Sequence, residues 1–205
     1  MTLMRRGTLF VVSAPSGAGK TTLCREVRQR VPGLAYSISV TTRVPRPGET
    51  NGVDFEFVDE ARFRAMIAGG EFAEHAVVHG HLYGTRAGTL ELALAAGTDV
   101  LLDIDTQGAA RLKAHSPEAV LVFIVAPSMA ELGQRLRERR SDNDTDIARR
   151  LTRAREEIAL WKRYDYLIVN RDVKEALDQL EAIITAERAR TSRLTLHFDD
   201  LEVPN

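Results

Sequence analysis

The sequence has little of several features that mark secreted, membrane or nucleic-acid-binding proteins. It contains one cysteine, Cys24, among 205 residues, so no disulfide can form within the chain. This cysteine usage is typical of proteins from a reducing compartment. Its 28 lysines and arginines are balanced by 29 acidic residues, which leaves a formal net charge of -1. We therefore expect no strongly basic surface of the kind that binds nucleic acid.

Long apolar runs are also scarce. The longest candidate, residues 120–126, is far shorter than the roughly 20 residues of a membrane-spanning helix. Arg5 and Arg6 precede a short apolar run at residues 9–12, which is too short for the central region of a signal peptide. We therefore expect a cytoplasmic protein that does not enter a membrane.

Short apolar segments alternate with longer segments of helical periodicity. The expected strands are residues 8–13, 100–105, 120–126 and 166–170. Each is mostly apolar without strict alternation, as strands covered on both faces are. Helical spacing follows in residues 23–31, 128–136, 147–158 and 173–184, and Ser128 with Glu131 reads as a capping box. This order predicts an α/β fold with a central parallel sheet flanked by helices.

Two stretches depart from this order. Residues 43–52 are dense in turn-forming residues, and residues 53–57 alternate apolar and acidic side chains like a strand with one solvated face. We expect residues of about 36–95 to form an inserted, partly antiparallel subdomain, and a second, polar excursion near 138–147. The core would then comprise residues 1–35, 96–137 and 148–190. The tail, 191–205, would fray or dock on a neighbouring subunit of a homo-oligomer.

The first expected strand leads into a glycine-rich motif, Ala14-Pro15-Ser16-Gly17-Ala18-Gly19-Lys20-Thr21. It matches the phosphate-loop pattern Gly-x-x-x-x-Gly-Lys-Ser/Thr except at Ala14. Gly17 and Gly19 let backbone N–H groups converge on phosphate oxygens at the start of the next helix. Lys20 would reach the β- and γ-phosphates, and the Thr21 hydroxyl suits Mg²⁺. We expect this loop, together with Thr22, to bind ATP.

Further motifs resemble those of the guanylate kinase family. They are residues 39–49 (SVTTRVPRPGE), residues 83–85 (YGT) and residues 102–108 (LDIDTQG), in the family's order and at near-family spacing. The resemblance extends from about Gly7 to Arg190. It implies a single-domain enzyme with a P-loop nucleoside monophosphate kinase fold, a GMP-binding subdomain and a lid. Such an enzyme phosphorylates GMP, and dGMP, to GDP with ATP and Mg²⁺.

The resemblance also implies roles for residues at matching positions. Arg43 and Arg46, joined by the Tyr83 hydroxyl, would bind the GMP phosphate. The guanine would be surrounded by Ser39, Glu74, Thr85 and Asp105. Asp103 would help to organise the Mg²⁺ shell through water. Arg139 and Arg150 would close over the triphosphate, and Asn170 would lie near the ATP base.

These residue types fit the chemistry of guanine. A hydroxyl can donate to the O6 carbonyl, and carboxylates can accept from N1–H and N2–H. Adenine presents a bare N1 acceptor on that edge, so a carboxylate would face a lone pair. Buried groups left unpaired in this way can reject an analogue by about 10⁴-fold. The alternatives are a guanylate-kinase-like protein-binding module without catalysis and a kinase for another monophosphate, such as AMP or UMP.

Phe55 departs from the family pattern. The family usually has a tyrosine there, whose hydroxyl contacts the acceptor phosphate. Because Phe55 alternates with Val53 and Phe57, we expect all three on one apolar face. We therefore expect a weaker grip on GMP, by about 1 kcal/mol for one hydrogen bond.

Overall fold

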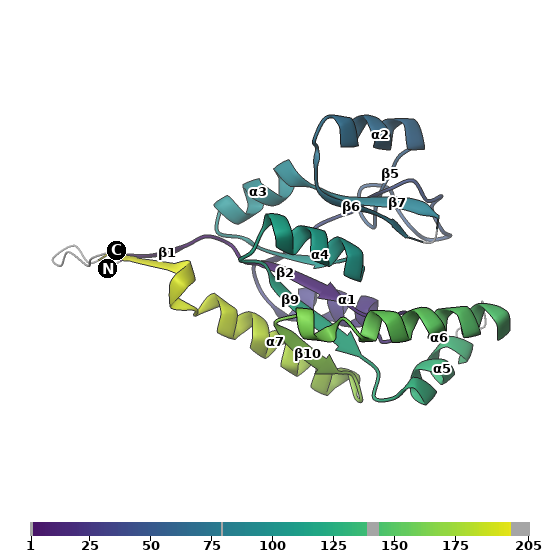
Figure 1. Ribbon diagram of the computed structural model, residues 1–205. Coiled ribbons are helices and arrows are strands. Elements are labelled where there is room, and N and C mark those ends of the chain that lie inside the picture. Colours follow the sequence, from purple (N-terminus) through teal and green to yellow (C-terminus); the bar gives the residue numbers. More distant parts are fainter. Residues whose placement is uncertain (1, 79, 139–143, 198–205) are drawn as a thin grey trace.

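The computed structural model describes residues 2–78, 80–138 and 144–197. The described residues form a five-stranded sheet, a four-stranded sheet and a two-stranded ribbon. Figure 1 shows the five-stranded sheet in the middle of the molecule, with the four-stranded sheet to one side of it. This arrangement separates a core layer from a smaller layer built on residues 40–86.

The five-stranded sheet is parallel throughout and has the order β10-β9-β2-β8-β3. Its strands are β2 (Leu9–Ser13), β3 (Leu34–Tyr36), β8 (Asp99–Asp103), β9 (Val120–Val125) and β10 (Tyr166–Val169). The predicted α/β fold with a central parallel sheet is confirmed. After β2, the chain forms β3 and β8 on one side of β2 and then β9 and β10 on its other side. A topological switch point therefore lies at the carboxyl end of β2.

Helices cover both faces of this sheet. They are α1 (Lys20–Arg30), α3 (Ala87–Ala95), α4 (Thr106–His115), α5 (Met129–Glu138), α6 (Asp144–Ile158) and α7 (Val173–Arg188), with a 3-10 turn η1 (Trp161–Arg163) after α6. One half of the predicted capping box is present, because the Glu131 N–H donates to Ser128 Oγ at 3.1 Å, whereas the Glu131 carboxylate pairs with Arg135. None of the helices in the described ranges has the length and apolar character needed to cross a membrane.

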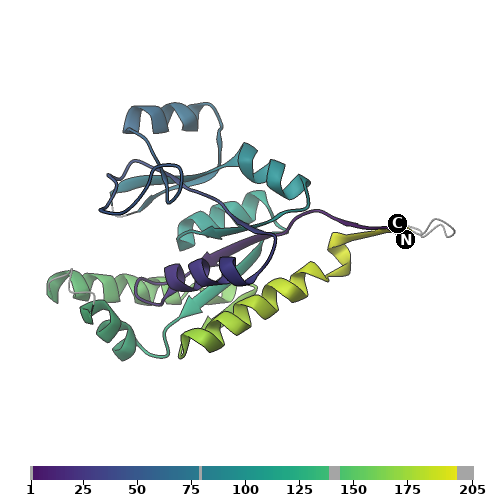
Figure 2. The same ribbon diagram turned by 180° about the vertical axis from the view of Figure 1, so that it is seen from behind.

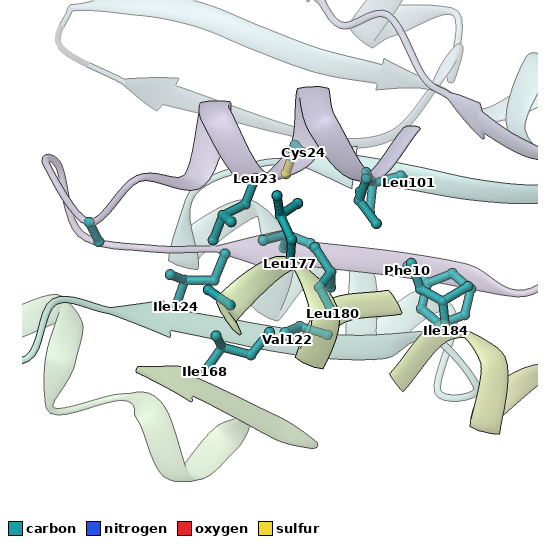
Figure 3. Packing of buried hydrophobic residues seen from close by; sticks show 14 of the residues in the cluster. Phe10, Leu23, Cys24, Leu101, Val122, Ile124, Ile168, Leu177, Leu180 and Ile184 are labelled. Atoms are coloured by element: carbon teal, nitrogen blue, oxygen red, sulfur yellow. The ribbon is translucent and has the colours of Figure 1, made fainter. Parts of the chain in front are cut away.

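Strand β2 shows why the apolar runs lack alternation. Its residues Phe10 and Val12 pack into one buried cluster, and Leu9 and Val11 pack into another. The first cluster lies between the sheet and helices α1 and α7, where Leu23, Leu177 and Leu180 meet Val122 and Ile168 (Figure 3). The second lies under α3 and α4. Each such buried aliphatic or aromatic side chain stabilises the fold by about 1.5–3 kcal/mol.

The four-stranded sheet has the order β5-β4-β7-β6 and mixed direction. Its elements are β4 (Val40–Thr41), β5 (Glu56–Phe57), β6 (Phe72–Val78), β7 (His81–Arg86) and the covering helix α2 (Glu60–Ala68). Its small core consists of Val40, Phe63 and Met66. Strand β6 runs along α4, which connects this sheet to the core layer.

Two of the predicted strands differ from the structure by more than one residue at an end. The strand expected at residues 53–57 is a turn up to Asp54, and β5 begins at Glu56. The turn closes because the Thr50 N–H donates to Asp54 Oδ2 at 2.8 Å, and Val53 is 63% exposed instead of lying on an apolar face. The strand expected at 100–105 ends at Asp103 because Asp105 is already the N-cap residue of α4.

The described part of the tail forms a strand. After the short turn η2 (Thr191–Arg193), β11 (Leu194–His197) pairs antiparallel with β1 (Thr2–Arg5), with Thr2 opposite His197. Figures 1 and 2 both show this ribbon extending away from the body of the molecule, beyond the end of α7. The two ends of the described chain therefore lie side by side.

Candidate active site

The glycine-rich loop connects β2 to α1 with a backbone that requires glycine. Gly17 and Gly19 have φ values of +92° and +97°, in the left-handed region. A Cβ atom on Gly19 would lie 2.3 Å from Asn170 Nδ2, and one on Gly17 would lie 3.1 Å from Leu136 Cδ2. The loop is therefore held between α5 and the end of β10, in a form that other residues cannot adopt.

Helix α1 lacks the side-chain cap that three other helices have. Helices α2, α4 and α7 each have an aspartate as N-cap residue, whose carboxylate accepts from a backbone N–H of the first turn. Helix α1 begins after Gly19, which has no side chain to do this, and its first turn contains no acidic residue. Its first N–H groups and the positive end of its dipole thus remain available for an anion.

Lys20 and Asp103 bring opposite charges together at the carboxyl ends of neighbouring strands. Asp103 ends β8, beside Val12 of β2. Lys20 Nζ lies 2.5 Å from Asp103 Oδ1 and donates to the Ile104 carbonyl oxygen at 3.0 Å. Although burial opposes its charge, the nearby Asp103 carboxylate raises the pKa of Lys20. The lysine is therefore a fixed positive charge next to the start of α1.

Arg43 lies in the loop after β4, and its guanidinium group contacts several side chains. Its Nη2 atom donates to Glu49 Oε1 at 2.9 Å, and its Nε atom donates to the Tyr83 hydroxyl at 3.2 Å. The hydrogen bond from Arg43 lowers the pKa of Glu49, and the same contact raises the pKa of Arg43. The guanidinium also lies 5.2 Å from the centre of the Phe55 ring, within range of a cation–π interaction.

A tight turn places the second arginine of this loop. Residues 46–49 close through a hydrogen bond from the Glu49 N–H to the Arg46 carbonyl oxygen at 3.0 Å, with Gly48 at φ +89°. Proline followed by glycine at the two central positions suits a type II turn. Glu49 Oε2 also accepts from the Arg46 N–H at 2.8 Å, so one carboxylate fixes both arginines. No role was predicted for Glu49, although its position beside Pro47-Gly48 was visible in the sequence.

Two carboxylates converge around Gly108. Glu74 is buried on β6, and its Oε1 atom accepts from the Thr85 hydroxyl at 2.7 Å. Asp105 Oδ1 accepts from the Gly108 N–H at 2.8 Å. A Cβ atom on Gly108 would lie 2.7 Å from Glu74 Oε2, so the glycine leaves room for that carboxylate. Burial raises the pKa of Glu74, and Asp105 adds to the shift while Thr85 opposes it.

The start of α1, Arg43 with its loop and the two carboxylates line one cleft with a volume of about 500 Å³. The cleft lies between the carboxyl end of the parallel sheet and the inner face of the four-stranded sheet. Its lining includes the predicted site residues Lys20, Thr21, Ser39, Arg43, Arg46, Glu74, Tyr83, Asp103 and Asp105. Glu49 and Phe55 line it as well. The structure thus brings Lys20 and Thr21 of the predicted donor site to the same cleft as most of the predicted acceptor residues.

Other predicted residues lie outside this lining. Thr85 is fully buried and touches Glu74 from behind. Asn170 lies beneath the glycine-rich loop, 2% exposed, and donates from Nδ2 to the Ala18 carbonyl oxygen at 2.8 Å. Residues 14–19 form the loop itself, and Thr22 is exposed on α1. Arg150 is half-exposed on α6, and Arg139 lies outside the described residues.

Comparison with known proteins decides the family. The guanylate kinase family model matches residues 6–187. The chain belongs to the guanylate kinase family. The guanylate kinase of Syntrophotalea carbinolica is 53% identical over 192 residues, which cover 94% of this chain and 91% of that protein. The guanylate kinase of Geobacter sulfurreducens is 50% identical and the match covers 94% and 95% of the two chains.

A solved structure supports the fold. The crystal structure of guanylate kinase from Anaplasma phagocytophilum matches with a TM-score of 0.80 and 35% identity, covering 94% of this chain and 92% of that one. The resemblance to guanylate kinases and the P-loop kinase fold that it implied are both confirmed.

Proposed function

We propose that this chain transfers the γ-phosphoryl group of ATP to the phosphate of GMP, giving ADP and GDP, and that it accepts dGMP as well. Membership of the guanylate kinase family supports this activity. The observation that carries it is the shared cleft, because Lys20 and Arg43 line the same cavity. A donor phosphate at α1 and an acceptor phosphate at Arg43 can therefore face each other.

The acceptor phosphate is bound by Arg43, Arg46 and the Tyr83 hydroxyl. Planar guanidinium groups bind phosphate oxygens with two parallel hydrogen bonds, which fixes both position and orientation. Glu49 holds Arg43 by its Nη2 atom and the Arg46 backbone by its N–H, so both arginines project from a fixed turn. The cost of ordering the Arg43 side chain is thus largely met before GMP arrives.

The guanine is read by Ser39, Glu74 and Asp105. The Ser39 hydroxyl donates to O6, and the two carboxylates accept from N1–H and N2–H. Asp105 Oδ2 is buried and has no hydrogen-bond partner among the described residues, so it can accept from the base. Thr85 supports recognition from behind through Glu74. An adenine would leave at least one buried carboxylate oxygen unpaired, which costs about 1–3 kcal/mol or more.

The donor triphosphate lies on the glycine-rich loop. Residues 14–22 surround its phosphates, with Lys20 at the β- and γ-phosphates, and Asn170 supports the loop from below. Thr21 and Asp103 fit Mg²⁺, because both present the hard oxygen atoms that this ion prefers and both line the cleft. Bound Mg²⁺ would supply charge neutralisation across the phosphate oxygens, with Asp103 acting through water.

The transfer itself needs no general base, since the acceptor is already an ionised phosphate. The work of the protein is to position two anions and to offset their charge as the phosphoryl group moves. Lys20, Arg43, Arg139 and Arg150 are the catalytic residues in this proposal. Arg139 and Arg150 belong to a lid of about 138–147 and its following helix, and residues of about 36–95 form the GMP-binding subdomain. A cytoplasmic location and a homo-oligomer remain predictions from the sequence.

An acceptor panel tests the proposed function. ADP release would be measured with GMP, dGMP, AMP, CMP and UMP at fixed ATP and Mg²⁺. We expect turnover with GMP and dGMP, and values of kcat/KM at least about 10³-fold lower for AMP, because the buried carboxylates would be mispaired. Absence of turnover with every acceptor would favour the protein-binding module, and a preference for AMP or UMP would overturn the guanine assignment.

Replacing Thr85 with valine should shift the pH dependence of GMP binding. Glu74 must be ionised to accept from guanine, and the Thr85 hydrogen bond lowers its burial-raised pKa. Removing the hydroxyl raises the pKa further, so affinity is lost at a higher pH as the solution is acidified. At pH 6 we expect Thr85→Val to bind GMP about fivefold more weakly than wild type.

Calorimetric titration between pH 5 and 8 measures this shift. The GMP phosphate titrates near pH 6 in every sample, so the difference between variants reports on the protein. Thr85→Ser is the matched control because it keeps the hydroxyl. Coincident pH curves for wild type and Thr85→Val would contradict the role given to Glu74.

Replacing Phe55 with tyrosine should strengthen GMP binding. Phe55 lines the cleft, and its ring lies 6.1 Å from that of Tyr83 and beside Arg43. A hydroxyl there adds one acceptor-phosphate contact, so we expect the KM for GMP to fall about fivefold, or about 1 kcal/mol. Phe57→Tyr is the control, because Phe57 is near Arg43 but does not line the cleft. An unchanged KM in Phe55→Tyr would show that the hydroxyl is not used.

A further inference from the structure

The side chain of Thr41 joins the backbone at Arg43 to strand β7. Thr41 is fully buried, and its hydroxyl donates to the Leu82 carbonyl oxygen at 2.9 Å. The same hydroxyl oxygen accepts from the Arg43 N–H at 3.2 Å. Because an N–H can only donate and a carbonyl can only accept, the direction of both hydrogen bonds is fixed. One buried hydroxyl therefore sets where the chain turns after β4 and ties that turn to β7.

The side chain of Thr42 replaces a backbone group of the strand pair. The Thr42 N–H donates to the Leu82 carbonyl oxygen at 3.0 Å, as in an antiparallel pair. The Leu82 N–H donates to the Thr42 hydroxyl oxygen at 2.9 Å, whereas in a regular ladder it would donate to the Thr42 carbonyl oxygen. Strand β4 can thus end at Thr41 while the following residue stays beside β7.

These hydrogen bonds determine how Arg43 and Tyr83 meet. Tyr83 directly follows Leu82 and lies opposite Thr41 in the register of β4 and β7. The Arg43 Nε atom donates to the Tyr83 hydroxyl at 3.2 Å. Arg43 and Tyr83 both line the cleft, whereas Thr41 and Thr42 do not. The two threonines can therefore act on a ligand only through the residues that they hold.

We propose that Thr41 and Thr42 are positioning residues for the acceptor phosphate, whose hydroxyls hold Arg43 in register with Tyr83. This inference rests on the proposed function, because it requires that Arg43 and Tyr83 bind the phosphate of GMP. Donors that are aligned before the ligand arrives bind it with less loss of conformational freedom. Loss of either hydroxyl should therefore weaken binding of the phosphate and leave recognition of the base intact.

Comparing GMP with guanosine tests the proposal, because guanosine lacks the phosphate. The Kd would be measured by calorimetry for GMP and by ligand-observed NMR titration for guanosine, without ATP or Mg²⁺. We expect Thr41→Val to raise the Kd for GMP about tenfold, since two hydrogen bonds are lost, and Thr42→Val about fivefold. The Kd for guanosine should change less than about twofold, because the two carboxylates of the base site lie on β6 and at the start of α4.

Two further variants serve as controls for the missing hydroxyl. Thr41→Ser keeps the hydroxyl and should bind GMP within about threefold of wild type. Thr152→Val removes a hydroxyl that donates to the Ala148 carbonyl oxygen at 3.1 Å on α6, far along the chain from this loop, and should bind like wild type. Preserved guanosine binding shows that the four-stranded sheet is folded in a variant. If Thr41→Val does not fold, Thr42→Val carries the test.

A double-mutant cycle identifies the residue through which Thr42 acts. In the Tyr83→Phe background, Thr42→Val should change the Kd for GMP less than about twofold. A full effect in that background overturns the inference. Equal GMP affinity of wild type and both valine variants also overturns it, as does an equal loss of affinity for GMP and guanosine, which would show a structural role alone. If the wild type itself does not bind GMP, the proposed function is wrong.

Discussion

Replacing Lys20 with methionine should lower kcat by about 10³-fold while the Kd for GMP stays within about threefold of wild type. Lys20 is the fixed charge at the start of α1, 2.5 Å from Asp103 and lining the cleft. Removing one preorganised donor to developing charge typically costs about 10²–10³ in rate, and here the triphosphate also loses its grip on the loop. Arg43, Arg46 and Tyr83, which bind the GMP phosphate in this proposal, belong to the four-stranded sheet and its loop, so phosphate binding is not directly affected.

The variant also leaves Asp103 without its partner, and this needs a separate measurement. The Asp103 side chain is 12% exposed, so its unpaired charge will lower stability. Thermal unfolding followed by circular dichroism shows whether the variant still folds cooperatively. Lys174→Met is the control, because Lys174 is exposed on α7 and pairs only with Asp178 among the described residues. If a folded Lys20→Met protein lost less than about tenfold in kcat, Lys20 would not be a catalytic residue of the transfer step.

Four of the five strands of the parallel sheet were predicted from their apolar runs, whereas β3, which is three residues long and only partly buried, was missed. A strand such as β9 presents apolar side chains to both clusters, so its sequence is a continuous apolar run of a length that few other elements share. The longer helices were predictable for a related reason. Helix α7, for example, buries Leu177, Leu180 and Ile184 at helical spacing.

The short helices were missed because each buries too little to make a period visible. Helix α2 buries Phe63 and Met66, and α3 buries Leu90 and Leu94. Two positions cannot distinguish a helix from a turn in a sequence of mixed polarity. Asp105 could have indicated α4 as an N-cap residue. It was assigned to the base alone, whereas in the structure its Oδ1 atom caps the helix and its Oδ2 atom is buried without a hydrogen-bond partner among the described residues.

Contacts between residues far apart in the sequence could not be predicted from local sequence patterns. The spacing of Arg153 and Glu157 indicated an ordinary pair on one helix, and the approach of Arg153 to Asp105 depends on how α6 lies against the end of β8. Residues 135–155 contain eight arginines, of which only Arg139 and Arg150 were given roles, and these came from the family resemblance. Members of this group differ in structure: Arg135 contacts Glu131 and the Asn170 carbonyl oxygen, Arg149 pairs with Asp146, and Arg153 pairs with Glu157 and lies 3.8 Å from Asp105.

Replacing Arg43 with glutamine should lower kcat/KM for GMP by about 10³-fold and leave the KM for ATP nearly unchanged. Two hydrogen bonds from a charged donor to a phosphate contribute about 1.5–3 kcal/mol each, and each 1.4 kcal/mol is a factor of ten. Arg43→Lys should recover little of this, because a point charge cannot reproduce the planar pair of donors. Arg64→Gln, an exposed arginine of the same subdomain paired with Glu60, is the control.

The effect of Arg43 has two sources, and Glu49→Gln separates them. Arg43 contributes its own charge, and its pair with Glu49 also shapes the turn that holds Arg46. If direct phosphate binding dominates, Glu49→Gln should lower kcat/KM by less than about tenfold, since both arginines remain. If Glu49→Gln lowered kcat/KM as much as Arg43→Gln does, the geometry of the loop would matter most. Arg43 would then act mainly by holding the turn that carries Arg46. If Arg43→Gln had wild-type kinetics, the acceptor phosphate would not bind at Arg43 and this part of the proposal would be wrong.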